Sequence, residues 1–179
     1  MSSPSAWVTR FAPLVALGAR VLDLACGQGR HARYFAGLGH RVLAIDRDLD
    51  ALATLRGVDG VETRHADLET DNWPLSEERF DAIVVTHYLH RPQFPHLLAA
   101  LRPDGVLIYE TFAEGNARFG KPSRPEFLLQ PGELLRAFGA ELTVVAFEQG
   151  QVARPAPAVI QRICALRPGG LAPPPLPIG

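Results

Sequence analysis

The chain has 179 residues, 47% hydrophobic and 21% charged, which is enough to build one sizeable core and is unlike a disordered protein. Eighteen basic and nineteen acidic side chains give a formal net charge of −1, which argues against a broad nucleic-acid or membrane-surface footprint. Two cysteines exclude a disulfide framework, no Cys/His cluster has metal-ligand spacing, and no apolar run is long enough to span a membrane. We therefore expect a cytoplasmic protein without a metal, nucleic-acid partner or membrane contact.

The chain is expected to begin with a helical segment over residues 1–18. Trp7 and Phe11 stand one turn apart there, and either core packing or cover for a bound cofactor would explain the pair. A short apolar run at residues 21–25 predicts the first strand. After two glycines, apolar residues at helical spacing predict a helix that ends near Gly39.

A second strand is expected at residues 41–45. Asp48 then has the position of a helix N-cap, and the helix is expected to end at Gly57. Residues 61–65 predict a third, weaker strand. The nearly continuous β-branched run at residues 80–85 is typical of a strand buried on both faces.

The next helix is expected at residues 94–101, followed by a turn at 102–105 in which Gly105 supplies the positive φ. Residues 106–111 predict a fifth strand. Residues 112–132 have no clear periodicity and several Gly and Pro residues, which is typical of a lid or binding loop.

A short helix around residues 134–138 precedes two strands, at 142–147 and 159–166, that we expect to pair antiparallel. The Pro/Gly-rich tail at residues 168–179 is expected to be mobile. Alternating strands and helices predict one α/β domain over residues 1–167, a Rossmann-like three-layer fold with a mostly parallel sheet. Ligands of such folds bind beyond the carboxyl ends of the strands.

The turn after the first strand contains Gly27 and Gly29, which allow a ligand to approach the backbone closely. With Ala32, their spacing satisfies the dinucleotide-binding fingerprint in its G/A form. Asp23, at the end of the same strand, would repel a pyrophosphate placed there. Its carboxylate suits a ligand that carries an ammonium group, such as S-adenosylmethionine.

Acidic residues also follow the second and third strands. Asp46 is placed to accept hydrogen bonds from both hydroxyls of a ribose, which either a nicotinamide or an adenosylmethionine site would use. Asp67 is placed to accept from an adenine amino group while Leu68 packs on the ring. A solvated loop acid would explain each aspartate alone, but three at successive strand ends favour a nucleoside with an amino-acid tail.

The segments VLDLACGQGRH and AID, together with FDAIVV and LRPDGVLI further on, resemble the motifs of class I S-adenosylmethionine-dependent methyltransferases. The CGQGR stretch is especially similar to the small tellurite-resistance type. The resemblance covers residues 20–112 and implies a seven-stranded sheet with an antiparallel closing strand. It further implies a methionine end held by the first motif, a ribose held by the acid after the second strand, and an adenine held after the third. The corresponding residues are Asp23, Ala25, Gly27 and Gly29, then Asp46, then Asp67 and Leu68. Ala25 departs from the glycine usual in the family.

Residues 86–91 follow the fourth strand, where the acceptor of a methyl group would enter. They lack the Asp/Asn-Pro-Pro-aromatic motif of enzymes that methylate amino groups of bases or glutamine. We assign Thr86 to the cofactor and predict His87 and Tyr88 as catalytic residues, although a histidine bonded to nearby backbone is an equal alternative for His87. Residues 118–121 are expected either to close over the substrate or to form an ordinary surface loop.

These features predict a methyltransferase that uses S-adenosyl-L-methionine and acts on a small molecule by in-line displacement, mainly through positioning. A non-catalytic S-adenosylmethionine-binding or regulatory protein is the first alternative. An NAD(P)-binding oxidoreductase is the second, and the short chain and Asp23 count against it. The sequence identifies neither the accepting atom nor the oligomeric state.

Overall fold

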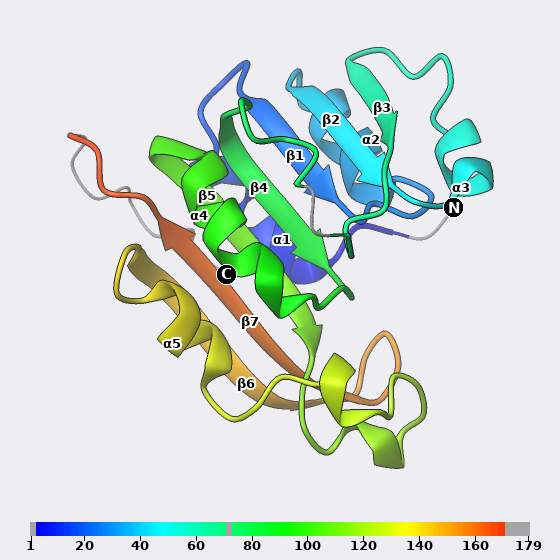
Figure 1. Cartoon of the computed structure of the whole chain (residues 1–179), viewed down its shortest axis with the longest axis vertical. Helices are drawn as coiled ribbons and strands as arrows, with labels where there is room; N and C mark the ends of the chain where they lie inside the picture. The colour runs from blue at the N-terminus through cyan, green and yellow to red at the C-terminus, as the bar shows by residue number, and fades with distance from the viewer. Residues whose placement is uncertain (1–2, 71–72, 171–179) are drawn as a thin grey trace.

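A computed structural model describes residues 3–70 and 73–170, so most of the tail predicted to be mobile (168–179) lies outside the described residues. Within them, seven strands form one sheet in the order β3-β2-β1-β4-β5-β7-β6 (Figure 1). The strands are β1 (Arg20–Leu24), β2 (Arg41–Asp46), β3 (Val61–His65), β4 (Phe80–Thr86), β5 (Leu101–Phe112), β6 (Thr143–Val152) and β7 (Ala158–Leu166).

Strands β1 to β5 are mutually parallel, whereas β7 runs antiparallel to both of its neighbours, β5 and β6. The chain order crosses over at β1 and β4, which brings the carboxyl ends of the central strands to one edge of the sheet. The predicted fold class, with its antiparallel closing strand, is confirmed. Ligands of open α/β sheets bind at such a point of reversed strand order.

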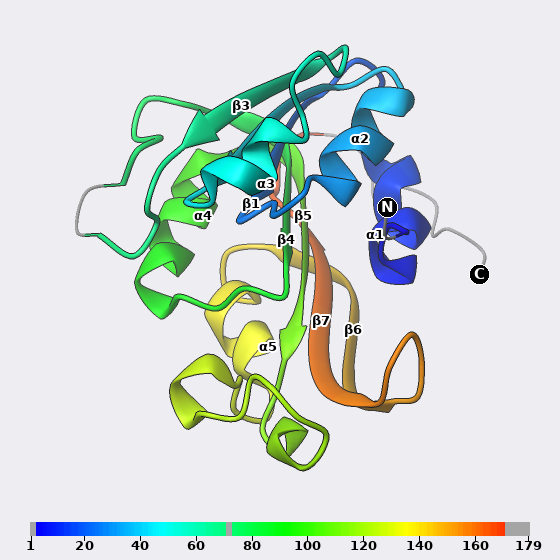
Figure 2. The same ribbon diagram turned by 90° about the vertical axis from the view of Figure 1, so that its right-hand side faces the viewer.

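Helices cover both faces of the sheet. The helices are α1 (Ala6–Phe11), α2 (Arg30–Gly37), α3 (Leu49–Ala53), α4 (Phe94–Ala100) and α5 (Glu133–Phe138). Figure 2 shows α1 and α2 on one side of the sheet and α4 and α5 on the other. Trp7 and Phe11 are each 1% exposed and pack edge to face in the core beneath α1, so the core-packing interpretation of this pair is the one that the structure supports.

Two local expectations were wrong. Residues 102–105, predicted as a turn, lie inside β5 where its register with β4 shifts. Asp104 has the positive φ (61°) there, and a Cβ on Gly105 would lie 2.8 Å from the Arg102 carbonyl oxygen. Helix α3 ends at Ala53, short of the predicted Gly57, since the chain continues in tighter turns that still bury Leu55.

Candidate functional site

The turn between β1 and α2 is wound into left-handed backbone. Ala25, Gly27 and Gly29 have φ values of 52°, 53° and 71°. A Cβ on Gly29 would lie 2.5 Å from the side chain of Leu55, so this position requires glycine on two counts. Ala25 adopts the same region at a steric disadvantage of about 1–2 kcal/mol.

Asp46, the last residue of β2, fixes this turn from the neighbouring strand. One carboxylate oxygen accepts a hydrogen bond from the Gly27 amide at 2.8 Å, and the other accepts from the Asp48 amide at 2.9 Å. A carboxylate offers about four acceptor positions, so two remain for a ligand. The ribose predicted at Asp46 would therefore find both oxygens already oriented.

Asp23 lies beneath the turn and is only 1% exposed. Its carboxylate accepts from the Ala32 amide at 2.9 Å and thereby ties the first turn of α2 to β1. Burial raises the pKa of Asp23 to about 8, against the opposing effects of the Ala32 hydrogen bond and of Arg30. Its carboxyl group is outside the cavity described next, so a ligand ammonium would have to approach it through the turn.

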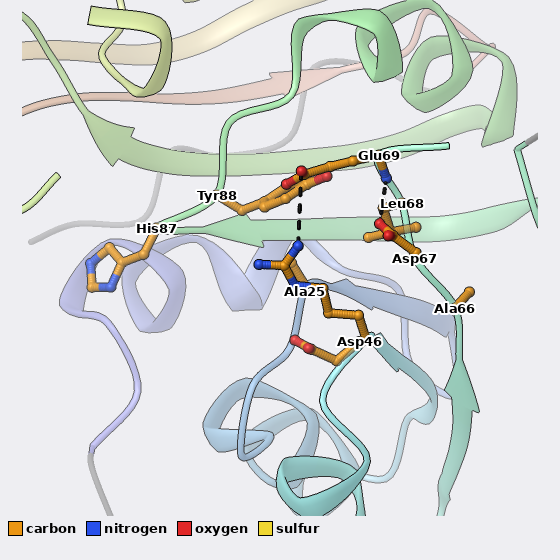
Figure 3. Close-up of a pocket in the computed structure, with 9 residues that line it drawn as sticks. Ala25, Asp46, Ala66, Asp67, Leu68, Glu69, His87 and Tyr88 are labelled. Atoms are coloured by element: carbon orange, nitrogen blue, oxygen red, sulfur yellow. Dashed lines mark hydrogen bonds and ion pairs between the residues drawn. The ribbon is translucent and has the colours of Figure 1, made fainter. Parts of the chain in front are cut away.

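A cavity of about 230 Å³ opens at the ends of β1 to β4 (Figure 3). Three successive strand ends and the glycine turn contribute its lining, which comprises Ala25, Asp46, Arg47, Ala66, Asp67, Leu68, Glu69, His87 and Tyr88. The cavity thus brings together six of the ten predicted cofactor and catalytic residues, namely Ala25, Asp46, Asp67, Leu68, His87 and Tyr88.

On the β3 side of the cavity, Leu68 is buried, and its carbonyl accepts a hydrogen bond from the Gln93 amide group. The Asp67 carboxylate is exposed and accepts from the Glu69 amide at 2.9 Å, which orients it. Arg47 and Glu69 form an ion pair at 3.9 Å between residues that line the cavity from β2 and β3. Sequence reasoning missed this pair, since neither residue belongs to a motif.

His87 stands at the end of β4 in left-handed backbone, with a φ of 55°. Its amide donates to the Glu110 carbonyl at 2.9 Å, and its ring lies 4.9 Å from that of Phe112. Figure 3 shows the imidazole pointing away from Asp46 and Tyr88. Burial, and next the charge of Arg30, lower the pKa of His87, whereas Glu110 opposes the shift. The imidazole is therefore neutral at pH 7.

Tyr88 forms part of the cavity wall and packs against the core. Its hydroxyl is buried and has no hydrogen-bond partner among the described residues. Burial and the nearby Glu69 and Asp67 carboxylates raise the pKa of Tyr88. A tyrosine in this state can donate a hydrogen bond but does not supply a phenolate base.

Thr86 does not line the cavity and belongs instead to a polar cluster that sequence reasoning missed. Its hydroxyl lies 3.4 Å from Nδ1 of His31, and Nε2 of His31 accepts from the Ser5 amide at 3.1 Å. The Ser5 hydroxyl donates to Glu110 at 2.8 Å, and Arg162 pairs with the second Glu110 oxygen at 3.2 Å. These contacts anchor the start of α1 at the carboxyl ends of β4 and β5.

Arg30, the first residue of α2, is another residue that the motif analysis passed over. It is half-buried and makes no hydrogen bond or ion pair with any residue in the ranges 3–70 and 73–170. Its charge nevertheless acts on Asp23, His31 and His87. An unpaired guanidinium beside the glycine turn gives this end of the site a positive charge.

Residues 21–105 match the family model described as a methyltransferase domain. Over this segment the chain is similar to methyltransferase domains. All ten predicted site residues, from Asp23 to Tyr88, lie inside the matched segment. The matched segment ends before the second half of β5, so the 112–132 loop and the β6–β7 hairpin lie outside it.

Individual relatives agree with this domain. A demethylmenaquinone methyltransferase from Clavibacter sepedonicus is 32% identical over 105 residues, covering 54% of this chain and 42% of the relative. This chain therefore spans less than half the length of that curated relative. TehB from Haemophilus influenzae has a TM-score of 0.77 at 19% identity, over 93% of this chain and 63% of TehB. A TehB-like S-adenosylmethionine-dependent methyltransferase from Corynebacterium glutamicum has a TM-score of 0.64 at 20% identity, over 90% and 86%. At these identities, the two structures show that the fold is shared.

Two further findings concern metal ions and membranes. Among the described residues, no cluster of three or more His, Cys, Asp or Glu side chains could hold a metal ion. No helix in the same part of the chain is long and apolar enough to cross a membrane.

Proposed function

We propose that this chain binds S-adenosyl-L-methionine and transfers its methyl group to a small-molecule acceptor. The observation that carries the proposal is the position of Asp46, which holds the glycine turn through one amide and faces a cavity whose opposite wall is Asp67 and Leu68. A ribose at Asp46 would place an adenine on Leu68, with the Asp67 carboxylate at the rim to accept from its amino group.

The methionine tail would then extend along the turn formed by Ala25, Gly27 and Gly29, above Asp23. The left-handed turn leaves open space beside Gly27, where a Cβ would meet no atom within 4 Å. A ligand ammonium near Asp23 would favour the carboxylate form and lower the raised pKa of this residue. The residues present at the cavity and the turn therefore fit this cofactor, whereas Thr86 lies outside the cavity.

When bound, S-adenosylmethionine supplies an electrophilic methyl group on a sulfonium. The chain would contribute orientation, by holding the ribose, the adenine and the methionine tail at separate strand ends, and this alone can supply much of the rate. If the acceptor must lose a proton, we propose that the neutral imidazole of His87 takes it. Tyr88 would act as a protonated wall and hydrogen-bond donor.

Calorimetric titration with S-adenosylhomocysteine and, separately, with NADH tests the cofactor assignment. We expect S-adenosylhomocysteine to bind and Asp46→Ala to weaken it by roughly thirtyfold, since about 2 kcal/mol of charged hydrogen bonding is lost. Asp46→Asn removes the charge but keeps one oxygen to accept from Gly27, at the loss of the hydrogen bond from the Asp48 amide. Asp59→Ala, which removes an exposed carboxylate elsewhere, should bind like the parent. Binding of NADH alone, or parental affinity in Asp46→Ala, would contradict the proposal.

Turnover is then sought by following S-adenosylhomocysteine formation with thiols, phenols, carboxylates and metalloid oxyanions as acceptors. Methylation of any of them distinguishes an enzyme from a regulatory binding protein, which would bind the cofactor without consuming it. With an acceptor in hand, unchanged turnover in His87→Ala would remove His87 as the base.

A further inference from the structure

The 112–132 loop is held in shape at its base. Asn116 is 2% exposed, and its side chain donates to the Pro122 carbonyl at 3.0 Å and accepts from the Val159 amide at 3.1 Å. Arg91 donates to two carbonyls of the loop, those of Glu126 at 2.8 Å and Leu128 at 2.9 Å. Ala113 and Leu129 close the loop with a backbone bridge. These contacts give the loop a defined surface.

That surface displays two aromatic rings. Phe119 and Phe127 are 38% and 41% exposed, and each has an arginine guanidinium over its ring. Arg118 lies 4.8 Å from the centre of the Phe119 ring, and Arg124 lies 5.5 Å from that of Phe127. A partly exposed aromatic face next to a cation can pack on a flat apolar ligand and attract a negative group on it.

The same surface carries more positive than negative charge. Between Ala113 and Leu129 there are three cations and two carboxylates, and the adjoining β6–β7 turn adds Arg154. Arg124 pairs with Glu126. Arg118 donates to the uncharged Gln151 amide at 3.1 Å, and within the described residues neither Lys121 nor Arg154 has a carboxylate partner. The loop and the turn lie side by side beyond the carboxyl end of β5 (Figure 1).

The base of the loop adjoins the proposed reaction site. Phe112, where the loop begins, lies against the ring of His87, and His87 lines the cavity. Arg91, four residues after His87, is the residue that fastens the far side of the loop. The loop is therefore attached at both of these places to the segment that follows β4.

We propose that the 112–132 loop and the β6–β7 turn bind the methyl acceptor and select a flat apolar molecule that carries an anionic group, a carboxylate or a phosphate. Lys121, Arg118 and Arg154 recognise the anion, and the two phenylalanines pack on the apolar body. The inference rests on the proposed function, because the bound molecule is an acceptor only if the methyl group is delivered at the His87 end.

Fluorescence titration of the S-adenosylhomocysteine complex tests this with three matched probes: 6-hydroxy-2-naphthoate, 6-hydroxy-2-naphthamide and 2-naphthyl phosphate. We expect the naphthoate to bind about tenfold more tightly than the amide, as two or three partly exposed charge contacts would give. The preference should weaken as salt is raised. The phosphate arm shows which anion the surface prefers.

Lys121→Ser combined with Arg154→Ser should reduce the preference to less than about threefold. The control is Arg41→Ser with Arg56→Ser. It removes the same net charge from two exposed residues outside the loop and the β6–β7 turn, and it should keep the preference for the naphthoate over the amide. Calorimetry with S-adenosylhomocysteine accompanies each variant and should give the parental dissociation constant. If S-adenosylhomocysteine does not bind to the parent, the proposed function is wrong, whether or not the naphthoate binds.

Equal affinities for the naphthoate and the amide on the parent would overturn the inference, and so would a preference that survives in the Lys121/Arg154 double variant. Binding of poly-L-glutamate without binding of the naphthoate or the phosphate would also overturn it, and would assign the surface to an acidic macromolecule. Loss of the preference in the Arg41/Arg56 control would attribute it to net charge and count against a local site.

Discussion

Two regions of this molecule orient their polar groups by different means: the ends of β1 to β3, in the first half of the chain, and the 112–132 loop, in the second half. At the ends of β1, β2 and β3, each predicted carboxylate accepts from a backbone amide at the same edge of the sheet: Asp23 from Ala32, Asp46 from Gly27 in the neighbouring turn, and Asp67 from Glu69. In the 112–132 loop, long side chains from distant segments reach backbone carbonyls instead, notably Arg91 and Gln161.

The difference bears on what each half can tolerate. The turn of the first half is shaped by its own backbone angles and by one close contact, so a single added atom disturbs it. The loop of the second half depends on side chains that reach it from elsewhere, and its tip is open to solvent. We expect the first half to be sensitive to backbone changes and the second to the loss of particular side chains.

The largest expected effect is that of Gly29→Ala. The new Cβ would need positive φ and would lie 2.5 Å from the Leu55 side chain, so we expect a loss of about 3 kcal/mol in the free energy of unfolding. Gly115→Ala in the other half is the matched variant, with φ of 93° and Val159 at 3.6 Å, and should lose only about 1–2 kcal/mol. Urea denaturation measures both. Equal losses would show that the contact with Leu55 relaxes freely.

The second effect concerns pH and the buried His31. Burial, followed by the charges of Arg30 and His87, lowers the pKa of His31 to about 3 from its ordinary 6.5. Above pH 6.5 the ring is neutral in both the folded and unfolded states. As the pH falls from 6.5 toward 3, only the unfolded state takes up the proton, so the stability decreases.

For this one group the decrease amounts to about 2 kcal/mol between pH 7 and pH 5. Unfolding of the parent and of His31→Gln at both values isolates it, since other titrating groups are shared. The stability of the parent relative to the variant should fall on acidification. A constant difference would mean that His31 is protonated within the fold and that its bond from the Ser5 amide is lost.

Asp23 should behave with the opposite sign. Its folded pKa of about 8 lies above the ordinary 3.8, so its contribution to stability is full below pH 3.8 and is lost as the pH rises toward 8. Asp23→Asn keeps an oxygen to accept from Ala32 and should be more stable than the parent at pH 8 by more than about 1 kcal/mol. If urea denaturation shows that Asp23→Asn is only as stable as the parent at pH 8, then groups around the Asp23 carboxylate offset more of the cost of its burial than we expect.

A third effect tests the other half. Arg91→Met removes the ion pair with Glu133 and both hydrogen bonds to the loop carbonyls, at a local loss of about 1–2 kcal/mol. We expect faster amide exchange at residues 113–129 and unchanged binding of S-adenosylhomocysteine. Arg79→Met, which removes an exposed arginine that is bonded to the nearby Ser76 and Glu78 carbonyls, is the control. Weaker binding of S-adenosylhomocysteine in Arg91→Met would show that the two halves are coupled.

Features that depend on local sequence could be predicted, whereas contacts between distant residues could not. The mostly parallel sheet, its antiparallel closing strand and the cavity residues Asp46, Asp67 and Leu68 could be predicted because strand ends are local and parallel strands bring them to one edge. The Ser5, His31 and Glu110 cluster joins residues up to 105 positions apart, and no local pattern marks it. The orientation of the His87 ring likewise depends on Phe112, which no spacing rule places beside it.

The smallest effect is expected at Ala25, where the chain departs from the glycine usual in the resembled family. Its φ of 52° disfavours any side chain, so Ala25→Gly removes a left-handed penalty of about 1–2 kcal/mol. Glycine also gives the unfolded chain more freedom, which offsets about 0.4–1 kcal/mol of this gain. A net stabilisation below about 1 kcal/mol should appear in urea denaturation, whereas Ala32→Gly, in regular helix, should destabilise. Because the Ala25 methyl lines the cavity, its removal should also alter S-adenosylhomocysteine affinity by only a few fold. A destabilised Ala25→Gly would mean that the packing of this methyl outweighs the strain of its backbone, so that the departure from glycine strengthens the turn.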